Sequence, residues 1–82
     1  MSEVLSAVAD LVEQITDVPV EEIGAASRFE TLDNWTSLAA LRLLTGVEDR
    51  FGVRLDLRAY FAANRVGELA SLISAELPER TA

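Results

Sequence analysis

The sequence contains no cysteine, no histidine and no lysine. Without cysteine it can form no disulfide and offers no thiol of its own. The usual general bases and nucleophiles are also missing, apart from carboxylates, hydroxyls and the phenol of Tyr60. The adjacent acids Glu21-Glu22 and Glu48-Asp49 do not replace them, because neighbours in a helix do not face each other. An enzyme is therefore the weakest interpretation of these residues.

Long apolar runs and basic clusters are scarce as well. No segment approaches the roughly 18 consecutive apolar residues that span a membrane. No basic stretch precedes an apolar run at the N-terminus, so we expect a cytoplasmic protein. The possible metal ligands are all oxygen donors and no EF-hand pattern is present, so we expect no metal site.

The net charge of −7 argues against a nucleic-acid partner, because phosphates are bound by clusters of Lys and Arg. The charge is also uneven along the chain. Residues 1–36 hold eight acids and one arginine, whereas residues 37–82 hold six acids and six arginines. The ordinary role of such acidity is to keep a protein soluble.

The apolar residues recur at helical spacing in four segments. Half of the 82 residues are apolar, which is enough for one compact core, so we expect a single domain over residues 1–82 with a frayed tail at 79–82. The pattern predicts an all-α fold, a small four-helix bundle with three longer helices and a short third one. The expected helices cover residues 3–17, 37–51, 57–63 and 65–77, with Ser2 and Asn64 as N-caps of the first and the last.

A long loop is expected between the first two helices, over residues 18–35. Loops of this length without structure are uncommon in compact domains and are usually functional or tied down. Val20 to Ile23 can form one helical turn, Phe29 and Leu32 can anchor the loop on the core, and Trp35 is expected to pack there too. We therefore predict a packed crossover.

The helix over 37–51 has two distinct faces, since each residue turns by about 100°. Gly46 inside this helix costs about 1 kcal/mol relative to Ala. It indicates a close backbone approach or room for a ligand, although simple tolerance explains it equally well. The residues expected on its core face are Ala40, Leu41, Leu44, Val47 and Phe51, those on its outer side are Leu38, Arg42, Thr45 and Asp49, and those turned inward on the short third helix are Leu57, Tyr60 and Phe61.

Ser37 opens this helix, directly after Thr36. A hydroxyl at a helix start either caps the helix or is a place of attachment. Thr36 can serve as the cap, and Leu38 places an apolar group on the surface beside the serine. Backbone N–H groups and the helix dipole at this end also favour an attached phosphodiester. The residues alone leave both roles of Ser37 open.

The segment from Thr36 to Val53 resembles the acyl carrier protein family. It reads TSLAALRLLTGVEDRFGV, and the family has Asp-Ser-Leu, a helix of the same length and Glu-Glu-x-Phe-Gly-(Val/Ile). The likeness extends to the first helix, the turn at 20–23, Phe29 and a Val-x-x-Leu-Ala opening of the last helix. It implies that Ser37 carries a 4′-phosphopantetheine arm, added from coenzyme A by a phosphopantetheinyl transferase. The thiol of the arm would hold acyl groups as thioesters for acyl-loading and acyl-processing enzymes.

Three positions depart from the family pattern. Thr36 replaces the Asp before the serine, so recognition by the transferase is expected to be weaker or more selective. Arg42 replaces a common Glu, so partners with basic patches are expected to bind less well, and Arg65 stands where carriers often have Thr. These departures favour polyketide or other specialised biosynthesis over housekeeping fatty-acid synthesis. The expected docking face of this monomeric carrier comprises Leu38, Arg42, Thr45 and Asp49.

Two other interpretations stay open. The run from Leu55 to Phe61 resembles peptidyl carriers, which would make the chain an aminoacyl or peptidyl carrier paired with an adenylating enzyme. The Thr36 that replaces the family's Asp gives some support to an unmodified helical interaction module. The identity of the cargo, the pathway and the loading enzyme do not follow from the sequence.

Overall fold

A computed structural model describes residues 3–77 of the chain. Over these residues the fold is helical, as predicted, with four α-helices, two short turns of 3₁₀ helix and a single isolated β-bridge. Ser2 and residues 79–82, where we expect a cap and a frayed tail, lie outside the described part. The elements are α1 (Glu3–Thr16), η1 (Val20–Glu22), η2 (Phe29–Thr31), α2 (Ser37–Phe51), α3 (Leu57–Ala62) and α4 (Val66–Glu76).

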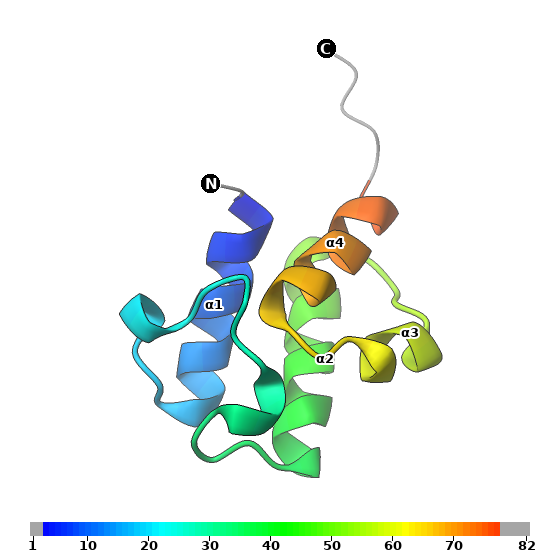
Figure 1. Cartoon of the computed structure of the whole chain (residues 1–82). Coiled ribbons are helices and arrows are strands. Elements are labelled where there is room, and N and C mark those ends of the chain that lie inside the picture. The colour runs from blue at the N-terminus through cyan, green and yellow to red at the C-terminus, as the bar shows by residue number, and fades with distance from the viewer. Residues whose placement is uncertain (1–2, 78–82) are drawn as a thin grey trace.

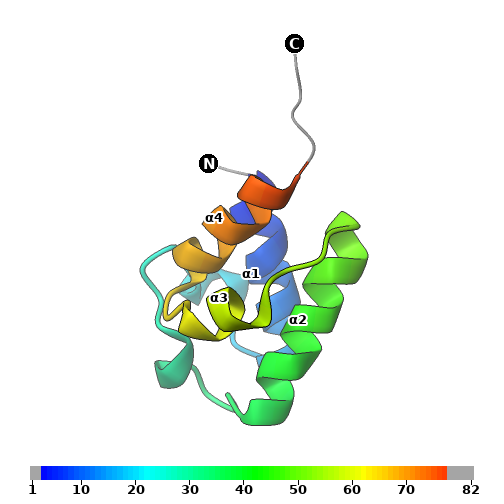
Figure 2. The same ribbon diagram turned by 90° about the vertical axis from the view of Figure 1, so that its right-hand side faces the viewer.

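Helices α1 and α2 run side by side in opposite directions, and the loop that joins them crosses one face of the molecule (Figure 1). Helix α1 packs against both α2 and α4, and the short α3 contacts α4. The view turned by 90° shows α3 lying across one side of α2 (Figure 2). One hydrophobic core lies between these helices. Its fully buried apolar residues are Val8, Val12, Leu43, Val47, Val66, Leu69 and Ile73.

The end of α1 is set by Asp17, whose backbone is left-handed with a φ of 65°. Its N–H donates to the carbonyl of Glu13 over 2.8 Å. The buried Thr16 hydroxyl donates to the carbonyl of Val12 over 2.8 Å and accepts from the N–H of Val18 over 3.2 Å. Helix α1 therefore ends one residue before the predicted end, because the turn closes on these local hydrogen bonds ahead of Pro19.

The long loop is tied to the start of α4, as the prediction of a packed crossover requires. The N–H groups of Val66 and Gly67 donate to the carbonyls of Ser27 and Ala25, over 2.9 and 2.8 Å. The N–H of Phe29 donates to the carbonyl of Asn64 over 3.0 Å. The first N–H groups of a helix have no partner within it, so this loop supplies acceptors that α4 lacks.

The predicted cap of α4 was displaced by one residue. Arg65, not Asn64, occupies the N-cap position. The carboxylate of Glu68 accepts from the N–H of Asn64 over 2.7 Å and from that of Arg65 over 3.4 Å. The Glu68 side chain thus satisfies the N–H groups of Asn64 and Arg65, as the Glu of a capping box does. No side-chain cap from Asn64 is needed.

Three residues that we expected in the core are exposed instead. Leu41 is 50% exposed, and Leu57 and Phe61 on α3 are 56% and 54% exposed. The predicted core face of α2 was too wide. The buried side of the helix is centred on Leu43 and Val47, and Leu41 lies outside it. Helix α3 has room for one inward side chain, and that side chain is Tyr60.

Candidate functional site

The start of α2 separates two adjacent hydroxyl groups. Thr36 has an extended backbone, and its Oγ1 accepts from the N–H of Ala39 over 3.0 Å, which makes it the N-cap. Ser37 is the first helical residue and is exposed. Within residues 3–77, no atom forms a hydrogen bond with the Ser37 side chain. The prediction that Thr36 caps the helix is confirmed. The Ser37 hydroxyl is therefore not needed as a cap.

The segment before Ser37 is held firmly against the rest of the fold. Asn34 is left-handed, with a φ of 65°, and its Nδ2 donates to the carbonyl of Thr16 over 2.9 Å. Trp35 stacks on the buried ring of Phe29, with ring centroids 4.9 Å apart and planes 20° from parallel. These contacts fix the loop to the end of α1 and to the core, and so fix the position from which Ser37 projects.

The electrostatic setting of Ser37 suits an anion. The first turn of α2 contains no acidic residue. The N–H groups of that turn and the helix dipole place partial positive charge at this end. A phosphodiester on Ser37 would therefore lie where a negative charge is favoured.

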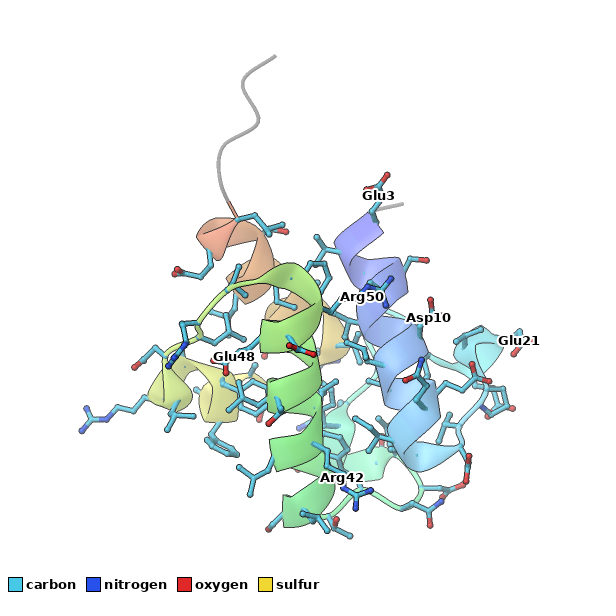
Figure 3. The ribbon with its side chains drawn as sticks, turned by 180° about the vertical axis from the view of Figure 1, so that it is seen from behind. Glu3, Asp10, Glu21, Arg42, Glu48 and Arg50 are labelled. Carbon is cyan, nitrogen blue, oxygen red and sulfur yellow. The ribbon has the colours of Figure 1, made fainter. Side chains whose placement is uncertain are left out.

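The four residues predicted for a docking face lie together on the outer side of α2. Leu38 is 58% exposed, and Arg42, Thr45 and Asp49 are also exposed. Their spacing of four, three and four residues places them along one helix face. Figure 3 shows Arg42 near the Ser37 end of α2, with Glu48 and Arg50 further along it. In the described residues the single ion pair joins Arg28 to Glu30 over 3.3 Å, so Arg42 and Asp49 have no ionic partner there.

Three further large apolar side chains, one on α2 and two on α3, are exposed contrary to expectation. Leu41, Leu57 and Phe61 are exposed large apolar residues like Leu38, and we had placed all three in the core. Leu41 follows Leu38 by three residues, a helical spacing that puts the two side chains on neighbouring positions of one face. This spacing could have predicted from the sequence that Leu41 is exposed beside Leu38. For Leu57 and Phe61 there was none, since α3 is too short for its pattern to define a face.

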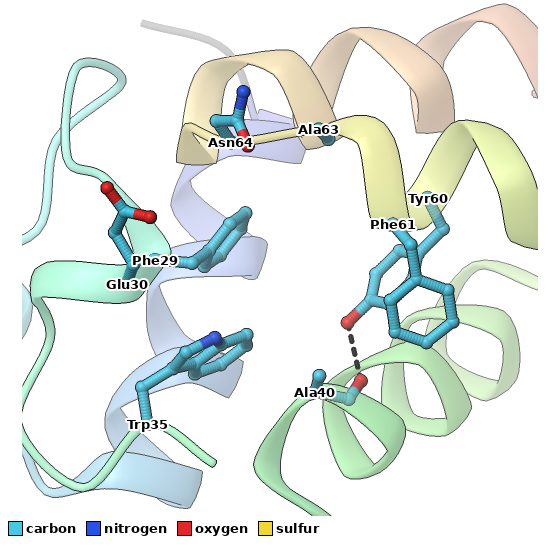
Figure 4. Close-up of a pocket in the computed structure, with 8 residues that line it drawn as sticks. All are labelled: Phe29, Glu30, Trp35, Ala40, Tyr60, Phe61, Ala63 and Asn64. Carbon is cyan, nitrogen blue, oxygen red and sulfur yellow. Dashed lines mark hydrogen bonds between the residues drawn. The ribbon is translucent and has the colours of Figure 1, made fainter. Parts of the chain in front are cut away.

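A cavity of about 200 Å³ opens beside the start of α2. Figure 4 shows Phe29 and Trp35 on one side of it and Tyr60 and Phe61 on the other. The hydroxyl of Tyr60 donates to the carbonyl of Ala40 over 2.5 Å, which ties α3 to α2. Burial raises the pKa of this phenol well above its ordinary value, so the group stays a hydrogen-bond donor.

The room that Gly46 suggested is not at Gly46. A Cβ at this glycine would lie 3.4 Å from Cδ2 of Leu11, an ordinary packing distance. A methyl group at Gly46 would thus make ordinary contact with Leu11, which fits simple tolerance of the glycine. The cavity lies instead nearer the start of α2, at Ala40.

In residues 3–77 no three acidic side chains gather in a way that could hold a metal ion. None of the helices in the same range has the length and apolar character needed to cross a membrane.

Comparison with known proteins identifies the family. Residues 6–73 match the family model described as the phosphopantetheine attachment site. The chain is 32% identical over 79 residues to acyl carrier protein 3 of Ralstonia nicotianae, a match that covers 96% of this chain and 91% of that protein. The chain belongs to the acyl carrier protein family, whose cofactor is covalent 4′-phosphopantetheine. Proteins of this family carry acyl groups for other enzymes and are not catalysts themselves.

Proposed function

We propose that this chain is a freestanding acyl carrier protein and that Ser37 is the residue to which the arm is attached. The observation that carries the proposal is the division of labour at the start of α2. Thr36 caps the helix, and the Ser37 hydroxyl is exposed and has no hydrogen-bond partner in the described residues. A capping serine would have to break its own hydrogen bond to react, and this serine does not.

The attachment step exchanges the phosphoanhydride linkage of coenzyme A for a phosphodiester linkage to Ser37. The Ser37 oxygen attacks the phosphorus that bears the pantetheine in coenzyme A and forms a P–O bond. The pyrophosphate linkage breaks, and adenosine 3′,5′-bisphosphate leaves with the bridging oxygen. The hydroxyl proton passes to a base of the transferase, because the chain has no histidine or lysine to accept it. The N-terminus of α2 then stabilises the phosphodiester anion.

The group that is attached supplies a thiol, which holds acyl cargo as a thioester. The chain's own contribution is to present this group to partner enzymes in turn. The exposed face of Leu38, Arg42, Thr45 and Asp49 adjoins Ser37 and supports a docking role for these residues. That the carrier works alone as a monomer, catalyses nothing and is cytoplasmic stays a prediction.

We also propose a class of cargo and pathway for this carrier. Arg42 on the outer face and Thr36 before the serine favour polyketide or other specialised biosynthesis, because an acidic helix would suit the basic docking patches of fatty-acid enzymes. An aminoacyl or peptidyl carrier paired with an adenylating enzyme is the second candidate, supported by the run from Leu55 to Phe61. Loading assays that compare amino acids with acyl donors separate the two.

The test is the intact mass of the protein after incubation with coenzyme A and a broad-specificity phosphopantetheinyl transferase. We expect a gain of one phosphopantetheinyl group in the wild type and in Ser71→Ala, a control that removes an exposed hydroxyl from α4. We expect no gain in Ser37→Ala. Unchanged mass of the wild type with several transferases would reject the proposal and favour an unmodified interaction module.

A further inference from the structure

The outer face of α2 has a projecting side chain at one end and a hollow at the other. At its start, the Leu38 side chain stands out from the surface and is 58% exposed. Beside the last turn of the helix lies an open hollow of about 490 Å³. The residues that line this hollow are Thr45, Glu48, Asp49, Gly52, Val53 and Arg54. One helix face therefore carries both an exposed leucine and a hollow large enough to receive one.

The charged groups on this face are of both signs and lie apart. Arg42 and Asp49 are exposed, and neither has an ionic partner within residues 3–77. They are seven residues apart, which is close to two turns at 3.6 residues per turn, so they leave α2 on the same side. Figure 3 shows Arg42 near the start of α2 and Glu48, the neighbour of Asp49, further along it. The positive group thus lies toward Leu38, whereas two acids and Arg54 give the hollow a border of net negative charge.

These features match when two copies of α2 lie antiparallel around a twofold axis. Such an axis makes an interface self-complementary, so every contact occurs twice. With the axis between Thr45 and Gly46, residues equally far from it along the helix face each other. Arg42 then lies opposite Asp49 of the second copy, and Leu38 lies opposite the end of the second helix, where Val53 lines the hollow. A single position of the axis produces both matches.

Two further observations favour this contact. The Thr45 hydroxyl, at the axis, donates to the carbonyl of Leu41 over 3.1 Å, so covering it leaves no polar group without a partner. The contact also lies in the electrically neutral part of the chain. Residues 37–82 hold six acids and six arginines, while the excess of negative charge belongs to residues 1–36.

We propose that the outer face of α2 binds a second copy of this chain, antiparallel around a twofold axis. Two Arg42–Asp49 ion pairs and the insertion of each Leu38 into the hollow of the other copy hold the dimer together. The contact covers the face proposed for docking, so a second copy and a partner enzyme exclude each other. It does not depend on the attachment at Ser37.

The dimer is expected to be weak. The 15 residues of α2 span about 22 Å at about 1.5 Å per residue, and one helix face of this length is smaller than the surface that stable dimers bury. We expect a dissociation constant of roughly 0.1–1 mM. The monomer predominates below this range and remains the form that docks.

The test measures self-association of the unmodified protein from NMR diffusion and from ¹⁵N chemical shifts as the concentration is raised through the expected dissociation constant. The two variants are Arg42→Glu and Asp49→Arg. Each of them places like charges opposite each other twice in its own dimer. Each should therefore raise the dissociation constant by roughly 2- to 30-fold, the effect of two exposed ion pairs.

A mixture of the two variants is the decisive experiment. When ¹⁵N-labelled Arg42→Glu protein is titrated with unlabelled Asp49→Arg protein, both ion pairs form again with their signs exchanged. The mixed dimer has the same net charge as the wild-type dimer, because one variant gains two negative charges and the other loses two. We expect the mixture to associate as tightly as the wild type does.

Two matched controls accompany the mixture. Arg50→Glu changes the net charge as Arg42→Glu does, but lies on another side of α2, and should leave the dissociation constant nearly unchanged. Leu38→Ser should weaken the dimer, whereas Leu57→Ser, at an equally exposed leucine on α3, should not. All of these side chains are exposed, so the fold should tolerate the changes.

Wild-type spectra and diffusion that do not change with concentration would overturn the inference. A mixture that associates no better than its separate variants would overturn it too. Equal weakening by Leu38→Ser and Leu57→Ser would mean unspecific apolar association and would also reject it. None of these results bears on the attachment at Ser37, which the intact mass tests separately.

Discussion

Thr36 and Ser37 carry similar hydroxyl groups one residue apart, yet within residues 3–77 only the Thr36 hydroxyl forms a hydrogen bond. The Thr36 Oγ1 accepts a hydrogen bond from the N–H of Ala39, while the Ser37 side chain makes none within residues 3–77. Replacing each residue by alanine should therefore change the free energy of unfolding by different amounts.

We predict that Thr36→Ala lowers the free energy of unfolding by about 0.5–2 kcal/mol, the usual cost of a lost N-cap. Ser37→Ala should change it by less than about 0.5 kcal/mol, as exposed substitutions commonly do. Urea unfolding followed by circular dichroism measures both. Equal losses in the two variants would show that Ser37 shares the capping role.

Tyr60 is the only side chain that titrates between the ranges of carboxylates and arginines, because the chain lacks histidine, cysteine and lysine and has one tyrosine. Burial raises the pKa of Tyr60 in the folded protein above the value of about 10 that it has in the unfolded chain. Between these two pKa values the folded state keeps the phenol proton and the unfolded state loses it. Stability from this group is therefore complete below pH about 10 and falls as the pH rises further.

We predict that the free energy of unfolding falls above pH about 10 in the wild type and stays flat there in Tyr60→Phe. At neutral pH this variant should be less stable by about 0.5–1.5 kcal/mol, because it lacks the hydrogen bond to Ala40. Denaturant titrations across the alkaline range, with phenolate absorbance as a second readout, test this. Ionisation of the folded protein near pH 10 would contradict a buried, bonded phenol.

Among the elements, α2 was predicted best because both of its ends are marked in the sequence. Its observed range, Ser37–Phe51, is the predicted one. Thr36 caps the start, and Gly52 adopts a left-handed φ of 66° at the end. Helix α3 was less predictable, because its short length gives no stable periodicity and the Tyr60–Ala40 hydrogen bond decides which side faces inward.

The two helical glycines differ in what a methyl group would meet. At Gly67, a Cβ would lie 2.9 Å from the carbonyl oxygen of Ala25, which also accepts the Gly67 N–H. At Gly46, the nearest atom is a flexible Leu11 methyl at 3.4 Å. The loop is therefore locked to α4 at a position where only glycine fits.

We predict that Gly67→Ala destabilises the protein by about 1–3 kcal/mol, because the loop backbone must move. Gly46→Ala should be neutral or stabilising by up to about 1 kcal/mol, the gain in helix propensity. Thermal or urea unfolding of the pair measures the contrast. A stable Gly67→Ala protein would mean that the loop is not held against α4.

At the scale of the whole molecule, the acidic residues and the proposed docking face are separated. The whole net charge of −7 lies in residues 1–36. The outer face of α2, in contrast, carries both Arg42 and Asp49 and has exposed apolar side chains beside them. If this face docks a partner, we expect that partner to present an apolar hollow and a carboxylate opposite Arg42. Partners whose docking patches are basic meet a like charge there.

We predict that Arg42→Glu raises kcat/KM for modification by a broad-specificity transferase with a basic docking patch, by up to about fivefold. The gain should shrink in high salt, because exposed charges are screened. Arg50→Glu is the matched control, since it makes the same change in net charge elsewhere on α2 (Figure 3). Identical kinetics for the two variants would remove Arg42 from the docking face.

The location of the cavity is a property of the whole fold that sequence patterns could not provide. Its walls come from Phe29 and Trp35 in the loop, Ala40 in α2 and Tyr60 and Phe61 in α3. No local spacing links these positions. Gly46, the local hint at free space, lies where a Cβ would make ordinary contact with Leu11, so this glycine indicates neither a cavity nor a close backbone approach.

We propose that Ser37, and no other hydroxyl, carries the arm. The chain has no lysine, so trypsin cuts it only after arginine, and cleavage after Arg28 and Arg42 releases residues 29–42. In this peptide the hydroxyl side chains are Thr31, Thr36 and Ser37. Fragment masses of the peptide from transferase-treated protein should place the phosphopantetheinyl group on Ser37. Its presence on either threonine or in another peptide would contradict the assignment.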